Sequence, residues 1–247
     1  MAGRTRKIIS AVIAALMIMA AGGCGSSNKE IPSSADNSRY VSETKDNGNV
    51  TDGKEYDIDN GGLPYDEETV YNQLFDINNK VEIDVDISDD ELAKMQSDYN
   101  RYDNMGSKSP IYRKCDLKIS ITSDGVKNTY IIRNTGIRMK GNTSRTAFYD
   151  SNSGVYSLIH FKVDFTETFD DEQYYGGDSD YDLDIDKEKQ QNRTFATLDS
   201  MEIKWNQTSD STYVREYYTC EMYRDFGILA PVSYTHLRAH ETDSYLV

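Results

Sequence analysis

The stretch VEIDVDISDDE, residues 81–91, alternates apolar and acidic side chains over seven positions and then becomes continuously polar. A period of two puts one kind of side chain on each face of a strand, so its first part predicts a half-buried β-strand. Ser88 stands three residues before Glu91, which is the spacing of a capping box at the start of a helix. We therefore expect a strand that leads into a short helix reaching to about Tyr99.

The same alternation recurs along the chain and predicts further strands. They are expected at residues 115–121, 128–133, 136–140, 156–165 and 198–205, with a hairpin turn at 123–125. Residues 212–226 carry apolar side chains at helical spacing and are followed by Gly227, so they predict an amphipathic helix. Together these elements predict an α+β fold over residues 81–231, with a mainly antiparallel sheet and packed helices.

The N-terminal segment predicts export and lipid anchoring. Three cations within the first seven residues precede an apolar run at 8–21 and the small-residue sequence AGGC at 21–24. This pattern is typical of a signal peptide, here residues 1–23, that ends in a lipobox, and two acyl chains on Cys24 would give a stable membrane anchor. We therefore expect a lipid-anchored protein on the extracytoplasmic side of the cell membrane. The alternative is an ordinary secretory signal with an incidental cysteine.

Residues 24–80 are expected to form a disordered tether. From 25 to about 60 the chain is rich in Ser, Asn, Asp, Gly, Glu and Lys, and residues 61–80 are transitional. So few aliphatic side chains cannot offset the entropy lost on folding.

The C-terminal stretch VSYTHLRAHET, residues 232–242, resembles the in-frame translation of a sequencing adapter. We therefore expect residues 232–247 to be an artefact and the native sequence to continue differently after Pro231. Two of the three histidines, His236 and His240, belong to this tail, so their spacing is not taken as a metal site.

Charge and cysteine content exclude several classes of function. The chain has 42 acidic and 27 basic residues and a net charge of -15, about -18 without residues 1–23. Such a chain repels nucleic acid, so no nucleic-acid partner is expected. Three cysteines exclude a disulfide framework, and Cys115 and Cys220 form either one bridge or two buried thiols.

The stretch GIRMKGNTSR, residues 136–145, is a basic segment in an otherwise acidic chain. It predicts a strand followed by a polar turn whose N–H groups, hydroxyls and cations can hold phosphate. Lys162, on a later strand, can also reach phosphate. Arg215, near a helix start, needs an acidic or phosphate partner there. The alternatives are a solvated hairpin turn, an exposed strand lysine and a surface salt bridge to Asp210 or Glu216.

Two other polar features give weaker indications. Five aspartates at alternate positions from Asp178 to Asp186 suggest calcium, but the spacing lacks the glycine and glutamate of an EF-hand, so a solvated acidic loop at 170–191 is preferred and no metal site is predicted. His160 lies on a predicted strand and is expected to be structural.

Three motifs in order resemble the spore coat protein H (CotH) kinase family. RMKGNTSR at 138–145 resembles the family's RGNSSR signature, and IHFKVDF at 159–165 resembles its YKIKFDK strand. Residues 201–231 are similar to a third block that ends in LGLPAP. The resemblance covers 81–231, and it departs from the family at Met139-Lys140 and in the inserted acidic loop.

The resemblance implies the N-terminal half of an atypical protein kinase that uses ATP and Mg²⁺ or Mn²⁺ to phosphorylate serine in secreted, surface or coat proteins. It implies that the residues facing the nucleotide are Arg138, Lys140, Asn142, Ser144, Arg145, Lys162 and Arg215. The family's catalytic and metal-binding aspartates lie further along its domain, so no catalytic residue is expected within these 247 residues and the fragment should be inactive.

Two other functions are compatible with the anchor. The chain could be a non-catalytic cell-surface or cell-wall-associated binding module. A solute-binding lipoprotein is less compatible, because the alternating βαβ pattern of such domains is missing from the sequence.

Overall fold

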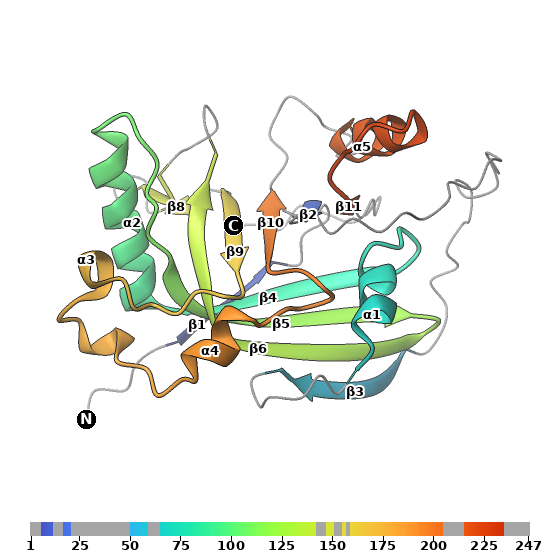
Figure 1. Cartoon of the computed structure of the whole chain (residues 1–247), viewed down its shortest axis with the longest axis horizontal. Helices are drawn as coiled ribbons and strands as arrows, with labels where there is room; N and C mark the ends of the chain where they lie inside the picture. Colours follow the sequence, from blue (N-terminus) through green and yellow to red (C-terminus); the bar gives the residue numbers. More distant parts are fainter. Residues whose placement is uncertain are drawn as a thin grey trace.

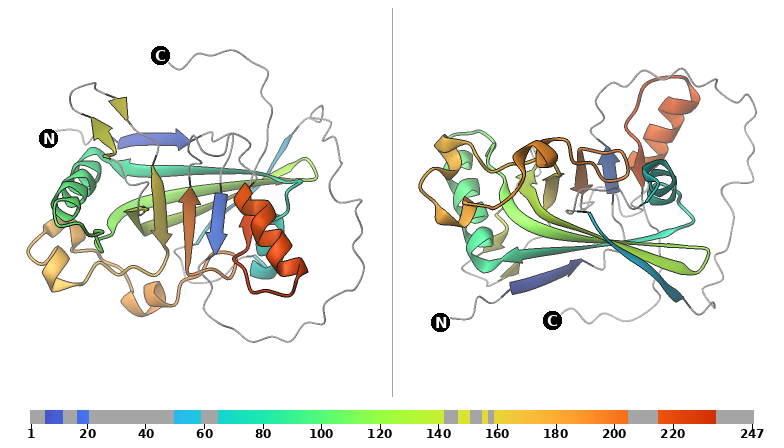
Figure 2. Two further views of the ribbon diagram at one scale, coloured as in Figure 1. Left: turned by 90° about the horizontal axis from the view of Figure 1, so that it is seen from above. Right: turned by 60° about the horizontal axis from the view of Figure 1, so that its bottom comes forward.

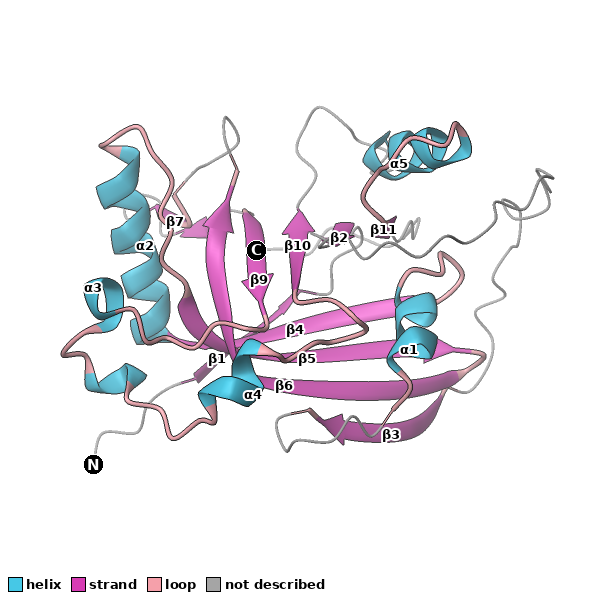
Figure 3. Ribbon diagram, in the orientation of Figure 1, coloured by secondary structure: helices cyan, strands magenta, loops and turns pink. Residues whose placement is uncertain are grey.

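The computed structural model describes residues 6–11, 17–20, 50–58, 65–141, 147–150, 155–156, 159–204 and 215–234. Its main sheet runs in the order β1-β4-β5-β6-β9-β10-β2-β11, and β3 pairs with β6 beside this path (Figure 1). All of these pairings are antiparallel except that of β3 with β6. Helices pack around the sheet (Figure 3), so the predicted α+β class is confirmed.

The element bounds are as follows. The strands of the sheet are β1 (Arg6–Ala11), β2 (Met17–Ala20), β3 (Thr51–Asp57), β4 (Lys80–Ser88), β5 (Arg113–Ser123), β6 (Val126–Lys140), β9 (His160–Asp164), β10 (Ser200–Lys204) and β11 (Ser233–Tyr234). A separate pair consists of β7 (Tyr149–Asp150) and β8 (Val155–Tyr156). The helices are α1 (Glu67–Leu74), α2 (Asp89–Asp103), α3 (Glu172–Tyr175), the 3₁₀ helix η2 (Ser179–Tyr181), α4 (Lys187–Gln191) and α5 (Arg215–Asp225).

The alternating stretch at 81–91 forms the predicted strand and helix. Val81, Ile83 and Ile87 of β4 are buried in the main core. The Ser88 hydroxyl accepts a hydrogen bond from the Glu91 N–H at 3.2 Å, as an N-cap does. The helix continues to Asp103, one turn beyond its predicted end.

The hairpin between β5 and β6 also forms as predicted. Asp124 and Gly125 have φ angles of 51° and 77°, the left-handed conformation that tight two-residue hairpins need. The two strands predicted at 128–133 and 136–140 are instead one strand, β6. A register shift opposite Cys115 and Leu117 absorbs the irregularity, with Asn134 at φ 48°, so the chain bends without ending the strand.

The folded region begins earlier than residue 81, so the predicted tether is wrong for residues 50–58 and 65–80. Strand β3 runs parallel to β6, and Val70 and Leu74 of α1 are buried in the core. The Tyr56 ring stacks on Tyr130 with 5.1 Å between centroids. Composition missed this part because a few well-placed aromatic and aliphatic side chains anchor it. Residues 24–49 lie outside the described residues.

Two segments of the predicted signal peptide lie in the sheet. Strand β1 is at its edge and pairs with β4, and β2 lies between β10 and β11. Cleavage after residue 23 and lipidation of Cys24 remain predictions. No helix in the described part of the chain is long and apolar enough to cross a membrane.

The acidic segment at 170–191 is folded, so the predicted solvated loop is wrong. Asp171, Asp178 and Asp186 each accept a backbone N–H as the N-cap of α3, η2 and α4. Tyr175 and Tyr181 are buried in a second cluster with Ile111 and Phe169. Figure 2 shows this segment (orange) at the same end of the sheet as α2. Its aspartates therefore start short helices, and its tyrosines fix them to the domain.

The two described cysteines, Cys115 and Cys220, are both buried and free. Of the two alternatives from the sequence, the buried thiols are confirmed and the bridge is wrong. Burial and neighbouring carboxylates raise the pKa of the Cys115 thiol well above its usual value, so it stays protonated.

Candidate anion-binding site

The predicted phosphate-binding residues Arg138, Lys140 and Lys162 are brought together on adjacent strands. In the register of β6, β9 and β10, Arg138 lies opposite Lys162, and Lys162 lies opposite Glu202. In the next row Lys140 lies opposite His160. Residues directly opposite in antiparallel strands share a face, so these side chains form one polar surface, called here the cation surface.

The pair Arg138 and Lys162 places two cations opposite each other, an arrangement that costs stability. Among the described residues neither of them forms an ion pair with a carboxylate. One Arg138 Nη donates to the Ser109 carbonyl at 3.3 Å, and its guanidinium carbon lies 5.1 Å from the centre of the Tyr112 ring. Its Nε is buried without a hydrogen-bond partner. This guanidinium therefore retains donors for a ligand.

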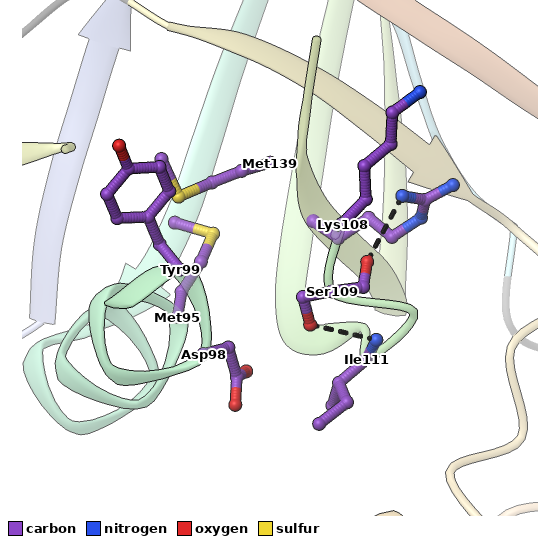
Figure 4. A pocket seen from close by; sticks show the side chains of 8 residues that line it. Met95, Asp98, Tyr99, Lys108, Ser109, Ile111 and Met139 are labelled. Carbon is purple, nitrogen blue, oxygen red and sulfur yellow. Dashed lines mark hydrogen bonds between the residues drawn. The ribbon is translucent and has the colours of Figure 1, made fainter. Parts of the chain in front are cut away.

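A small cavity lies beside Arg138 (Figure 4), with Met95, Tyr99 and Met139 on one side and Lys108 and Ser109 on the other. Its volume of about 20 Å³ suits a single water molecule and is far too small for a nucleotide. Any larger anion must therefore contact the open cation surface itself.

The pKa values show that positive charge is concentrated here. Burial lowers the pKa of Lys140, and the cations Lys204, Lys162, Arg138 and Lys108 lower it further, in that order. Burial also lowers the pKa of His160, with a further contribution from Lys204. In a chain with net charge -15, this local concentration of cations is the feature that most favours an anionic ligand.

Two glutamates partly neutralise the cation surface. Glu202 forms ion pairs with Lys140 and, at 3.8 Å, with Lys204. Glu216 of α5 pairs with Lys204 at 2.5 Å and so ties the start of this helix to β10. The surface and its immediate surroundings hold five cations and the carboxylates of Glu202 and Glu216, which leaves a formal charge of +3. The five cations are Arg138, Lys140, Lys162, Lys204 and Lys108.

The remaining predicted residues are placed as follows. Arg215 is the exposed first residue of α5, next to Glu216. Asn142, Ser144, Arg145 and the predicted lipid site Cys24 lie outside the described residues. Sequence reasoning missed Lys108, Lys204 and Glu202, although the alternation SMEIK at 200–204 indicates that Glu202 and Lys204 share a face. It assigned His160 only a structural role, whereas the register places it in the row beside Lys140.

A second group of polar residues, which the sequence analysis did not predict, forms a buried hydrogen-bond network that stabilises the fold. Arg113 donates two hydrogen bonds to Asp98 at 2.7 and 2.9 Å and a third to the Tyr181 hydroxyl at 2.9 Å. The Tyr181 hydroxyl donates to Glu91 at 2.5 Å. Because the charged groups of this buried network have partners, it fixes the acidic segment to α2 and β5.

An acidic pocket of about 170 Å³ borders this network, lined by Asp86, Glu91, Asp116 and Asp180. Lysines already neutralise part of it, since Lys94 contacts Glu91 at 3.4 Å and Asp180 at 3.3 Å. We assign no ligand to it.

The donor set fits phosphate and does not fit the metal that the family resemblance implies. An arginine with a free N–H and a lysine beside it are typical phosphate ligands. The described residues contain no group of three or more His, Cys, Asp or Glu side chains placed to hold a metal ion.

The chain matches no protein-family model, no curated protein and no solved structure.

Proposed function

We propose that this chain is the N-terminal part of a surface-anchored atypical protein kinase of the CotH type. In this proposal the cation surface holds the phosphates of ATP for transfer to serine in secreted or surface proteins. The observation that carries it is the facing pair Arg138 and Lys162, which has no carboxylate partner among the described residues. The resemblance of residues 138–145 and 159–165 to the family's motifs supports the same assignment.

The chemistry of the two side chains divides the task. A guanidinium donates N–H groups in a fixed planar fork that matches two phosphate oxygens, so Arg138 orients the phosphate. An ammonium acts as a compact charge with rotatable donors, so Lys162 neutralises it. Phosphoryl transfer depends mainly on positioning and charge stabilisation, and these residues supply the nucleotide-binding part of both. The expected property of the chain is therefore nucleotide binding without turnover.

The experiment is a calorimetric titration of the purified 247-residue chain with ATP, ADP, AMP and adenosine. We expect affinity to decrease in that order, with no binding of adenosine, because the phosphates make the contacts. The variant R138Q/K162Q should bind ATP at least roughly tenfold more weakly. The matched control is K118Q, which removes an exposed lysine from β5 of the same sheet and should bind ATP like the wild type. Equal affinity for ATP and adenosine would contradict the proposal.

A second candidate function is a non-catalytic cell-surface binding module. It is favoured by the apolar side chains that α5 and the following segment expose, including Met222, Phe226 and Leu229. The abundant tyrosines favour it less, because Tyr130, Tyr175 and Tyr181 are buried. This function becomes the better assignment if the chain binds none of the phosphate compounds.

A further inference from the structure

We propose that Glu202 is the internal counterion of the cation surface, and that an anionic ligand binds by displacing its carboxylate from Lys140 and Lys204. This inference rests on the proposed function, because it concerns the same surface.

The position of Glu202 is the first argument. It lies opposite Lys162 in the register, so its carboxylate completes the row that begins at Arg138. It also forms ion pairs with Lys140 and Lys204, one on each side of β9. Its side chain is 13% exposed, against 32% for Lys140 and 24% for Lys204. The carboxylate thus sits inside the group of lysines, where the oxygen of a bound anion would lie.

The distribution of ion pairs gives the order of events. Arg138 and Lys162 have no carboxylate partner among the described residues, so they can receive the ligand first. Lys204 keeps a partner throughout, because Glu216 holds it at 2.5 Å. Only Lys140 must exchange its Glu202 partner for a ligand oxygen. The displacement therefore breaks the two ion pairs of Glu202. The incoming anion replaces the one with Lys140, while Lys204 keeps its pair with Glu216.

This exchange sets a charge requirement on the ligand. A monoanion that displaces the Glu202 carboxylate only substitutes one negative charge for another. A ligand with two or more negative charges adds charge that Arg138 and Lys162 neutralise. The surface should therefore discriminate in favour of pyrophosphate and nucleoside polyphosphates and against carboxylates and other monoanions.

The test is the variant E202Q, which removes the charge and keeps the shape of the side chain. We expect pyrophosphate to bind E202Q roughly tenfold more tightly than the wild type, and acetate to gain measurable binding. The matched control is E82Q on β4, because Glu82 also pairs with two lysines, Lys80 at 2.8 Å and Lys127 at 2.9 Å, away from this surface. E82Q should leave the affinity for pyrophosphate unchanged.

The outcomes separate this inference from the proposed function. Weaker or unchanged pyrophosphate binding by E202Q would overturn it, even if the wild type still requires Arg138 and Lys162 for binding. Absence of binding in both proteins would overturn the proposed function as well. If E202Q loses its cooperative thermal transition, E202D replaces it. Its shorter carboxylate should reach the lysines less well and so give an intermediate gain, and no gain would contradict the inference.

Discussion

Arg138 of β6 lies directly opposite Lys162 of β9, two cations in register within a chain of net charge -15. Such a pair is unfavourable in a sheet, and among the described residues neither member forms an ion pair, although Glu202 lies opposite Lys162 on the other side. Local conflicts of this kind are expected where a protein gives up stability for function.

Replacing Lys162 should therefore stabilise the protein while it weakens ligand binding. We expect K162Q to raise the free energy of unfolding by about 0.2–1 kcal/mol, because it relieves the cross-strand repulsion. Urea denaturation monitored by circular dichroism measures this difference, with K118Q as the control that should change little. A less stable K162Q protein would show that the attraction between Lys162 and Glu202, opposite it on β10, outweighs the repulsion from Arg138.

Anion binding should strengthen as the pH falls from about 8 to about 6. Burial and the cations Lys204 and Lys140 lower the pKa of His160 in the free protein, against the opposing effect of Glu216. A bound anion favours the imidazolium and raises this pKa, so binding takes up a proton. Titration with pyrophosphate across this range should show the trend in the wild type and lose most of it in H160N. A flat profile in the wild type would place His160 outside the site.

The same pKa shift predicts the pH dependence of stability without ligand. A histidine whose pKa is lowered by folding binds protons more readily in the unfolded state, so stability falls as the pH drops below the unfolded pKa of about 6.5. H160N should show a shallower loss of stability between pH 7 and pH 5 in urea denaturation. An equal slope in both proteins would contradict the shift.

Removing the Tyr181 hydroxyl should destabilise the domain strongly. Y181F removes one hydrogen bond from Glu91 and one from Arg113, and a hydrogen bond to a charged group contributes about 1.5–3 kcal/mol. The matched control is Y174F in the same helical segment, where the half-buried ring remains in place. Thermal unfolding measures both variants. Equal destabilisation by Y181F and Y174F would show that the hydrogen bonds of the Tyr181 hydroxyl contribute no more than the hydroxyl of an ordinary half-buried tyrosine.

The domain should unfold at alkaline pH because its tyrosines cannot ionise while buried. Burial raises the pKa of Tyr130 to about 12 and also raises the pKa values of Tyr65, Tyr175 and Tyr181. Unfolded tyrosine ionises near pH 10, so stability is present below that value and is lost as the pH rises above it. Ultraviolet titration should show a late, cooperative tyrosine step that coincides with unfolding. Gradual ionisation of all tyrosines near pH 10 in the folded protein would contradict this.

Sequence patterns correctly predicted those helices and strands that are marked by residues close together in the chain. Alternation located β4 and β5, and the capping spacing located the start of α2. Alternation could not show that the two halves of β6 form one strand. The bulge at Asn134 interrupts the alternation, and only the pairing with β5 shows that the strand continues. It also missed β3 and α1, because their stability comes from contacts such as Tyr56 with Tyr130, which are distant in sequence.

The site was predicted residue by residue but not as an arrangement. Each of Arg138, Lys140 and Lys162 stood out chemically, yet strand register alone makes Lys162 face both Arg138 and Glu202. The acidic segment misled for a related reason. Its charge indicated a solvated loop, whereas Tyr181 anchors it through contacts with residues far away in the sequence.

The central claim is that the facing cations Arg138 and Lys162 bind phosphate. A calorimetric titration of the 247-residue chain with ATP, compared with R138Q/K162Q and K118Q, tests it most directly. The account predicts saturable binding that weakens at least roughly tenfold in R138Q/K162Q and is unchanged in K118Q. The same ATP affinity in all three proteins would contradict it.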